Sequence, residues 1–314
     1  MHDLTQKLTK SRELSWKHFG KSITFYLPGM FHYHGMTGKY PAISITGNRC
    51  ALHCDHCRGK ILDSMVSTTT PDSLLETCIK LAERGNKGVL ISGGCDSHGR
   101  LPWDPFIAAI AEIKKKTRLH ISVHSGLVDH HTALRLKEAG VDQALIDVIG
   151  DDITFHSIYK LPFGVSRIAS SLEALQSAGL PVIPHIVCGL YYGQVSSEKE
   201  AIRMISRFDV KQIVIVSLMK IPGTPAWAFP SPSAEAVADV IVEARSHLPK
   251  TLISLGCARQ RGNTPLEILA LDAGVNRMAL PSEEVIERAK SYGLNIRYQK
   301  TCCSIWEDYS EDKW

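Results

Sequence analysis

The segment NRCALHCDHC, residues 48–57, places three cysteines close together, at Cys50, Cys54 and Cys57. A short loop with this spacing can bind three corners of an iron–sulfur cube through cysteine thiolates. No fourth cysteine follows nearby, so the fourth iron is left without a protein ligand. Catalytic metal sites keep such an open coordination position for a substrate or a cofactor, as catalytic zinc does. The segment therefore predicts an iron–sulfur centre that binds a small molecule at one iron.

Two other interpretations of these cysteines are weaker. Three thiols cannot all pair in disulfides, and the chain opens on a polar segment with Lys7, Lys10 and Arg12 instead of a secretory signal. A zinc site would normally show a second Cys or His pair at a fixed interval, and none follows closely. We therefore expect bound iron and sulfide.

The composition is that of an ordinary globular protein. The 314 residues are 44% hydrophobic and 22% charged, which is enough to bury a large core. The net charge of +4 is too small to indicate a nucleic-acid partner. No apolar run approaches the length of a membrane span, so we expect no membrane partner. Nine cysteines without a targeting signal favour the reducing cytoplasm, with thiolates bound to metal.

Short β-rich apolar runs alternate with helical patterns along the whole chain. Glycines such as Gly140 and Gly179 stand where a helix should end and turn into the next strand. Eight such units predict an α/β fold, a closed (β/α)8 TIM barrel, in preference to an open sheet. The predicted strands are 42–46, 88–92, 119–124, 143–148, 182–187, 212–217, 251–255 and 277–280.

The chain contains no linker and no low-complexity segment, so a single domain over 1–314 is the simplest organisation. Within it we expect an N-terminal extension over 1–40, the barrel over 41–294 and a C-terminal tail over 295–314. We expect the tail to fold back over the barrel mouth.

Chemistry in such barrels lies at the C-terminal ends of the strands, in the loops that follow them. The cysteines of 48–57 follow the first strand, and Gly93 and Gly94 follow the second. Two adjacent glycines let the backbone approach a ligand closely. Asp147 ends the fourth strand and is a further candidate for ligand binding. We expect all of these residues at the barrel mouth.

The remaining cysteines divide by position. Cys78 lies in a helical pattern among leucines, as a small core residue does. The others fall at strand ends or in the tail, where inert packing explains them less well. The candidate ligands of a second iron–sulfur cluster are Cys95, Cys188, Cys257, Cys302 and Cys303. The alternative, that some of them are buried loop cysteines and only one cluster exists, stays open.

The loop at 48–57 resembles the cluster loop of the radical S-adenosylmethionine (SAM) enzymes. In that family three such cysteines hold a [4Fe–4S] cluster, and the fourth iron binds the amino and carboxylate groups of SAM. One electron then cleaves SAM to a 5′-deoxyadenosyl radical, which takes a hydrogen atom from an unactivated C–H bond. The resemblance implies that Gly93 and Gly94 contact the methionine amino group. It also implies that Asp147 binds the ribose hydroxyls and that the His56 ring packs near adenine.

Two longer segments resemble biotin synthase within that family. They are SITGNRC at 44–50, which leads into the cluster loop, and MKIPGTP at 219–225, which follows the sixth strand. Biotin synthase holds a second, sulfur-donating cluster with further cysteines after strand two and on strands three and five, plus an arginine on strand seven. The resemblance therefore implies a second cluster here as well.

The second-cluster positions depart from the biotin synthase pattern. Cys95 falls at the first of them, but Ser122 stands at or near the strand-three position. Cys188 is displaced from the strand-five position, strand seven offers Cys257, and a Cys-Cys pair is added in the tail. A second cluster that is kept but held by ligands at different positions makes dethiobiotin a less suitable substrate.

The chain is most similar to the biotin-synthase-like proteins that act in pairs as the archaeal-type lipoyl synthase. This resemblance implies a radical SAM sulfurtransferase that inserts sulfur from the second cluster into a protein-bound octanoyl chain. The implied partners are SAM, an octanoylated carrier protein or peptide, a second radical SAM protein, and an electron donor such as ferredoxin or flavodoxin.

Three alternatives remain. They are biotin synthase itself, a one-cluster radical SAM mutase or maturase, and a non-catalytic iron–sulfur scaffold subunit. The paired glycines and Asp147 argue against a scaffold, which needs no SAM pocket. Because SAM and the clusters supply the chemistry, we assign no residue as a catalytic acid or base.

Overall fold

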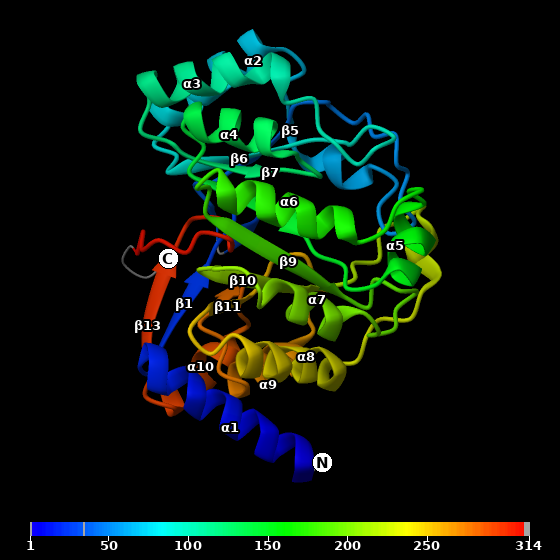
Figure 1. Cartoon of the computed structure of the whole chain (residues 1–314). Helices are drawn as coiled ribbons and strands as arrows, with labels where there is room; N and C mark the ends of the chain where they lie inside the picture. Colours follow the sequence, from blue (N-terminus) through cyan, green and yellow to red (C-terminus); the bar gives the residue numbers. More distant parts are fainter. Residues whose placement is uncertain (1, 34, 311–314) are drawn as a thin grey trace.

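The structure, a computed structural model, describes residues 2–33 and 35–310 (Figure 1). Its centre is one curled, parallel sheet of 11 strands. All eight predicted strands are present within two residues of their predicted ends, so the barrel-type α/β fold is confirmed. In sheet order the strands are β13 (Asn295–Gln299), β1 (Ser22–Tyr26), β12 (Arg277–Ala279), β11 (Leu252–Leu255), β10 (Gln212–Ser217), β9 (Val182–Cys188), β8 (Gln143–Asp147), β7 (His120–His124), β6 (Gly88–Ser92), β4 (Ala42–Ser44) and β5 (Val66–Ser67).

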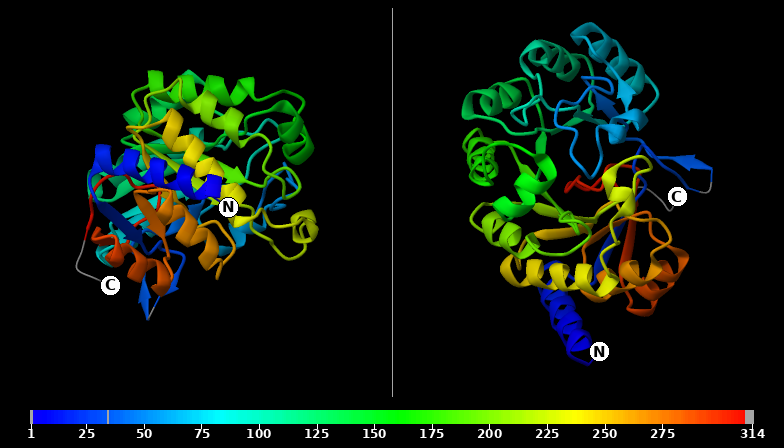
Figure 2. Two further views of the ribbon diagram at one scale, coloured as in Figure 1. Left: turned by 90° about the horizontal axis from the view of Figure 1, so that it is seen from below. Right: turned by 90° about the vertical axis from the view of Figure 1, so that its right-hand side faces the viewer.

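Helices cover the outer face of this sheet, because each crossover between parallel strands returns over the same side (Figures 1 and 2). None of the helices in the described residues is long and apolar enough to cross a membrane. The α-helices are α1 (His2–Phe19), α2 (Pro71–Glu83), α3 (Ile107–Lys116), α4 (His130–Glu138), α5 (Asp152–Tyr159), α6 (Ser166–Ser177), α7 (Glu198–Ile205), α8 (Ala234–His247), α9 (Thr264–Asp272) and α10 (Glu283–Ser291). Short 3-10 helices and a small hairpin complete the fold: η1 (Lys60–Ser64), η2 (Asp104–Phe106), η3 (Pro225–Ala228), β2 (His32–Tyr33) and β3 (Met36–Thr37).

Polar caps set where several of these helices begin. Thr70 and Ser73 form a reciprocal capping box at the start of α2, in which each side chain accepts a hydrogen bond from the other backbone N–H. Asp129 and Asp151 cap α4 and α5 by accepting from the backbone N–H three residues on. At the end of α4, Gly140 takes the predicted left-handed conformation (φ 90°).

The sheet curls without closing into a ring of hydrogen bonds, in contrast to the closed barrel that we expected. In the described strands the order runs linearly from β13 to β5. At one end β1 and β13 pair in parallel, with Ser22 opposite Asn295, because residues 295–299 form a strand instead of a tail. The division of the chain into extension, barrel and tail otherwise stays a prediction.

The segment after β13 lies inside the curled sheet, where Figure 2 (right) shows it in red between the two halves of the molecule. Lys39 N, just before β4, donates to Lys300 O at 2.6 Å. Farther along, Glu307 Oε2 lies 3.5 Å from Nε2 of His120, at the start of β7. Residues 300–309, called the tail segment below, therefore enter the barrel from the N-terminal ends of the strands. We had expected them to lie over the opposite, C-terminal mouth.

Inward-facing side chains from five strands hold the tail segment by its peptide backbone. All five are buried, and each donates a hydrogen bond to a tail carbonyl oxygen. Each such bond contributes about 1 kcal/mol, and its loss would leave a buried polar group unpaired. The bonds run from Tyr26 Oη and Arg277 Nη1 to Ile305 O (2.9 and 2.7 Å), from Gln143 Nε2 to Ser304 O (3.1 Å), and from Gln212 Nε2 and Ser254 Oγ to Cys303 O (2.9 and 3.0 Å).

Candidate functional site

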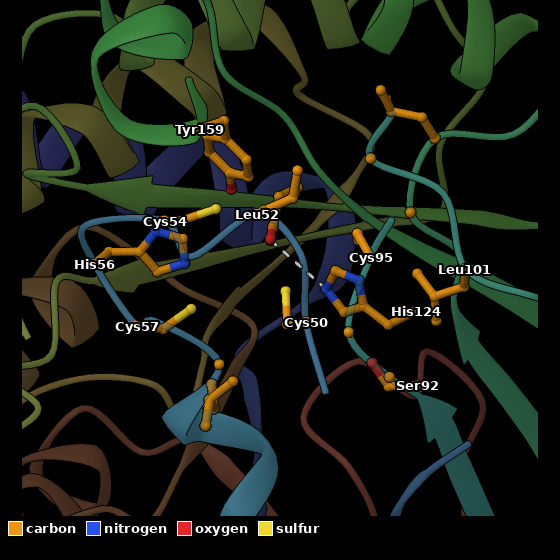
Figure 3. Close-up of a pocket in the computed structure, with 18 of the residues that line it drawn as sticks. Cys50, Leu52, Cys54, His56, Cys57, Ser92, Cys95, Leu101, His124 and Tyr159 are labelled. Atoms are coloured by element: carbon orange, nitrogen blue, oxygen red, sulfur yellow. Dashed lines mark ion pairs between the residues drawn. The ribbon is translucent and has the colours of Figure 1, made fainter. Parts of the chain in front are cut away.

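The C-terminal ends of the strands surround a cavity of about 210 Å³, called the mouth pocket below (Figure 3). Cys50, Cys54 and Cys57 line one side of it, and their sulfur atoms point into the same space. The other predicted ligand-binding residues line it too: His56, Gly93, Gly94 and Asp147. The structure thus brings together every residue that we predicted to hold the first cluster or its ligand, while their individual roles remain predictions.

Tight turns shape the cluster loop, residues 50–57. His53 takes a left-handed backbone conformation (φ 47°), and so does Arg58 (φ 47°), directly after the third cysteine. The N–H groups of Cys57 and Arg58 donate to Cys54 O at 3.1 and 2.8 Å. These bonds curl the backbone around the three sulfur atoms, as a ligand loop for one cluster requires.

Gly94 lies against the cluster loop at a place where no side chain fits. A Cβ atom there would come within 2.6 Å of Cys50 Cβ and closer still to Arg49 O. The backbone is fixed in this position because Gly94 N donates to Thr46 Oγ1 at 2.7 Å. The close approach ties Gly94 to the cluster loop, while the contact of the paired glycines with the methionine amino group stays a prediction.

We expect Gly94→Ala to lower the affinity for SAM by about tenfold or more, because the added Cβ collides with loop backbone that cannot yield cheaply. The dissociation constant is measured by equilibrium dialysis of SAM against anaerobically reconstituted protein. Gly179→Ala serves as the control. It costs about 1–2 kcal/mol of stability at a left-handed glycine, but nothing lies within 4 Å of the new Cβ, so SAM affinity should not change. Unchanged affinity in Gly94→Ala would contradict the proposed contact.

A charged pair stands beside the cysteines. His124 Nε2 lies 3.6 Å from Asp147 Oδ1, as the dashed line in Figure 3 marks. Burial alone would raise the pKa of Asp147, but the charge and hydrogen bond of His124 lower it to about 2. Burial alone would lower the pKa of His124, but the charge of Asp147 and the hydrogen bond to it raise that pKa. The two side chains stay 28% and 35% accessible although they point into the barrel, so the interior beside them is hollow.

His56 lies deeper in the same pocket, with its ring 5.6 Å from the ring of Tyr159. Burial lowers the pKa of His56, so the ring is neutral at physiological pH. Its Nδ1 is buried and has no hydrogen-bond partner in the protein. A buried ring nitrogen left unpaired in this way indicates a place for a bound polar group.

The thiols of the cluster loop are better suited to binding a metal than to pairing with one another. Burial raises the pKa of Cys57 to about 11 and also raises that of Cys54. Protein groups alone therefore leave these thiols protonated at neutral pH. Iron would supply the missing positive charge and release the protons. Three convergent thiols beside a hollow and a glycine contact thus fit a cubane cluster held by Cys50, Cys54 and Cys57.

A second group of thiols lies inside the barrel. Cys302 and Cys303 belong to the buried tail segment, and Cys257 follows β11. The thiols of Cys257 and Cys302 each interact with the thiol of Cys303. The hydrogen bond from Cys303 outweighs burial and lowers the pKa of Cys302 to about 7. These three residues are called the tail thiols below.

The other two candidates for the second cluster lie elsewhere, which corrects our expectation of one shared site. Cys95 lines the mouth pocket with the loop cysteines. Cys188 packs in the apolar layer between sheet and helices, where Glu198 is its charged neighbour. Successive side chains of β9 point to opposite faces of the sheet. Because His185 and Val187 face inward, the side chain of Cys188 faces outward. In the described chain, only the tail thiols come together away from the mouth.

No three His, Cys, Asp or Glu side chains among residues 2–33 and 35–310 are set as ligands of a single metal ion. An iron–sulfur cluster is held differently, because each cysteine binds its own iron and the sulfurs stand farther apart.

The sequence assigned no role to His124, His185 or Tyr159, which the structure places in or below the mouth pocket. The sequence did contain a signal for the inward-facing residues, because successive side chains of a strand point alternately to the inner and the outer face of the sheet. This alternation puts Asp147 and His185 on the inner face of the sheet, at every second position of β8 and β9.

The model of the radical SAM superfamily matches residues 44–217, more than half of the chain. The chain belongs to the radical SAM superfamily. The match runs from the end of β4 to the end of β10 and includes the cluster loop and all the residues that line the mouth pocket. Membership implies a [4Fe–4S] cluster and SAM as its ligand, and the mouth pocket brings together the residues that would bind them.

Relatives within the superfamily are distant. The chain is 25% identical to biotin synthase of Rickettsia felis over 241 residues, which are 74% of this chain and 76% of that protein. It is 22% identical to 3-methylornithine synthase of Methanosarcina acetivorans over 255 residues, 79% and 70% of the two chains. A crystal structure of methylornithine synthase superposes with a TM-score of 0.65 at 18% identity, over 93% of this chain and 89% of that one. The chain is thus biotin-synthase-like, and its likeness to the solved structure is one of fold alone.

Proposed function

We propose that this radical SAM enzyme is a sulfurtransferase that inserts sulfur into unactivated C–H bonds of a protein- or peptide-bound octanoyl chain, as a component of a lipoyl synthase. The observation that carries the proposal is the meeting of Cys257, Cys302 and Cys303 inside the barrel. Sulfur insertion needs two centres, one for hydrogen abstraction and one that gives up sulfur. Two separate thiol groups in one barrel meet that need.

When bound, the first cluster and SAM would supply hydrogen abstraction, and a second cluster would supply sulfur. The protein's own residues bind, orient and exclude water. Cys50, Cys54 and Cys57 would hold the first cluster, and Asp147, kept ionised by His124, would accept hydrogen bonds from ribose hydroxyls. The tail segment, held inside the barrel by side chains of the strands, would help to exclude bulk water from the barrel interior.

Much of the mouth-pocket lining apart from the cysteines is apolar, which supports an alkyl substrate. Such a lining binds a hydrocarbon chain by removing it from water, at roughly 0.8 kcal/mol for each buried CH2. The residues that form it include Leu62, Leu101, Ile149, Phe155 and Leu161. We propose a carrier protein or peptide as the bearer of the chain, with a second radical SAM protein and a ferredoxin or flavodoxin as further partners.

Two other reactions are second candidates. The similarity to biotin synthase of Rickettsia felis favours the biotin synthase reaction. We place it second because the cysteine positions of this chain differ from the biotin synthase pattern. A one-cluster reaction is favoured by the likeness to 3-methylornithine synthase, because the product in that name contains no sulfur. Such a reaction would give the tail thiols no function.

The test incubates anaerobically reconstituted protein with SAM, a reductant and an octanoylated carrier or octanoyl-lysine peptide, with and without a second radical SAM protein. We expect mass spectrometry to show sulfur added to the octanoyl chain. A deuterated chain should pass deuterium into 5′-deoxyadenosine, since its C–H bond is the one broken. Omission of SAM is the control. Sulfur added to dethiobiotin and none to octanoyl would assign the protein as biotin synthase, and sulfur added to neither would refute sulfur transfer.

A further inference from the structure

One histidine of the barrel interior faces the tail segment. His185 lies in the middle of β9, and its Nε2 is 3.1 Å from Ser304 Oγ. The thiol of Cys302 in turn lies 3.5 Å from the same Ser304 oxygen. His185 and Cys302 therefore contact the same tail hydroxyl, His185 from β9 and Cys302 from within the tail.

The ring of His185 is already in the form that binds metals. Its Nδ1 lies 3.0 Å from Ile183 O, and a carbonyl oxygen only accepts, so Nδ1 carries the proton. Burial and the nearby charge of His124 lower the pKa of His185 to about 4, so the ring is neutral at physiological pH. Nε2 then carries the lone pair and points toward the tail. A metal-bound imidazole typically donates its other N–H to a carbonyl oxygen in this way.

The other inward-facing histidines are occupied. His124 directs Nε2 to Asp147. His120 has Nδ1 2.8 Å from Tyr40 Oη and Nε2 3.5 Å from Glu307 Oε2. On β7, β8 and β9, His185 is thus the histidine whose Nε2 is directed at Ser304, the residue that follows Cys302 and Cys303 in the tail segment.

We propose that His185 Nε2 is the fourth protein ligand of the second iron–sulfur centre, beside Cys257, Cys302 and Cys303. This inference rests on the proposed function, which requires that centre. Three thiols alone would leave one corner of a cubane without a protein ligand, and His185 fills that position from the strand opposite the tail. A neutral imidazole in place of a fourth thiolate makes the centre less negative and easier to reduce, as histidine ligands do in other iron–sulfur proteins.

The test uses a background in which only the second centre can form, the variant with Cys50, Cys54 and Cys57 all replaced by Ala. This protein is reconstituted anaerobically, reduced, and made with either natural or 15N-labelled histidine. Pulsed electron paramagnetic resonance should then show nitrogen coupling that changes with the label. Adding His185→Ala or His185→Cys should remove the coupling, and His185→Cys should keep the iron and sulfide because it offers a thiolate instead. His120→Gln is the matched control and should leave the coupling in place.

The outcomes separate this inference from the proposed function. Iron and sulfide without histidine coupling would refute the role of His185 but leave a second centre in place. Coupling that persists in His185→Cys would assign the ligand to another histidine and refute the inference as well. If the background variant binds no iron, there is no second centre, and both the inference and the sulfur-transfer proposal fail.

Discussion

Replacing Cys50, Cys54 and Cys57 together by Ala should abolish the reductive cleavage of SAM to 5′-deoxyadenosine. These thiols are the three that converge on the mouth pocket, and without them no iron is held where SAM would bind. Loss of an essential catalytic group lowers rates by about 10⁴-fold or more. The measurement is 5′-deoxyadenosine formed per protein by chromatography, with dithionite as reductant.

Cys78→Ala is the control for this variant. Cys78 is fully buried in α2, outside both thiol groups, so its loss should cost on the order of 1 kcal/mol of stability and leave cleavage unchanged. Cleavage at the parent rate in the triple variant would mean that the first cluster is held elsewhere.

Replacing Cys257, Cys302 and Cys303 together by Ser should leave SAM cleavage in place but abolish sulfur addition to the octanoyl chain. The mouth pocket has none of these residues in its lining, so the first cluster should form as in the parent. Ser keeps the size and the hydrogen bonding of the buried group while removing the thiolates that would hold the second cluster. Mass spectrometry of the octanoyl product and of 5′-deoxyadenosine measures both steps in one reaction.

Cys188→Ala is the matched control, because Cys188 was a candidate ligand that the structure places in the outer apolar layer. It should retain sulfur addition. Sulfur addition by the tail triple variant would show that the sulfur comes from another source. Loss of SAM cleavage along with sulfur addition would show that the substitutions disturb the whole barrel.

The strands could be predicted because each one carries its own local signal. The run QIVIVS of β10 is buried on both faces, and such a strand is recognisable from its own residues. The open sheet could not be predicted, because it depends on which strands lie at its two edges, β13 and β5, and on the pairing of segments far apart in the chain. β1 and β13 are 269 residues or more apart in sequence, from Tyr26 to Asn295, and no local pattern encodes their pairing.

The site divides in the same way. Cys50, Cys54 and Cys57 share one loop, so their spacing alone predicted a common site. The tail thiols join Cys257 to residues 302–303 through side chains of five strands, and that long-range arrangement has no signature in spacing. Counting cysteines therefore grouped Cys95 and Cys188 with them, whereas the faces of the strands separate all three places.

Side chains of the strands bind the tail segment through its backbone carbonyl oxygens, which are present whatever the tail sequence is. Different residues therefore hold the tail segment and determine its chemistry. Side chains of the strands bind the tail backbone, and residues 302–304 determine which side chains the barrel interior contains. The hydrogen bonds that hold the tail backbone therefore do not depend on which side chains the tail carries, whereas the buried side chains of Cys302, Cys303 and Ser304 determine the chemistry of the barrel interior. In such a fold, substitutions at a few buried positions of the tail would change the ligands inside the barrel while the strands that hold the tail stay the same.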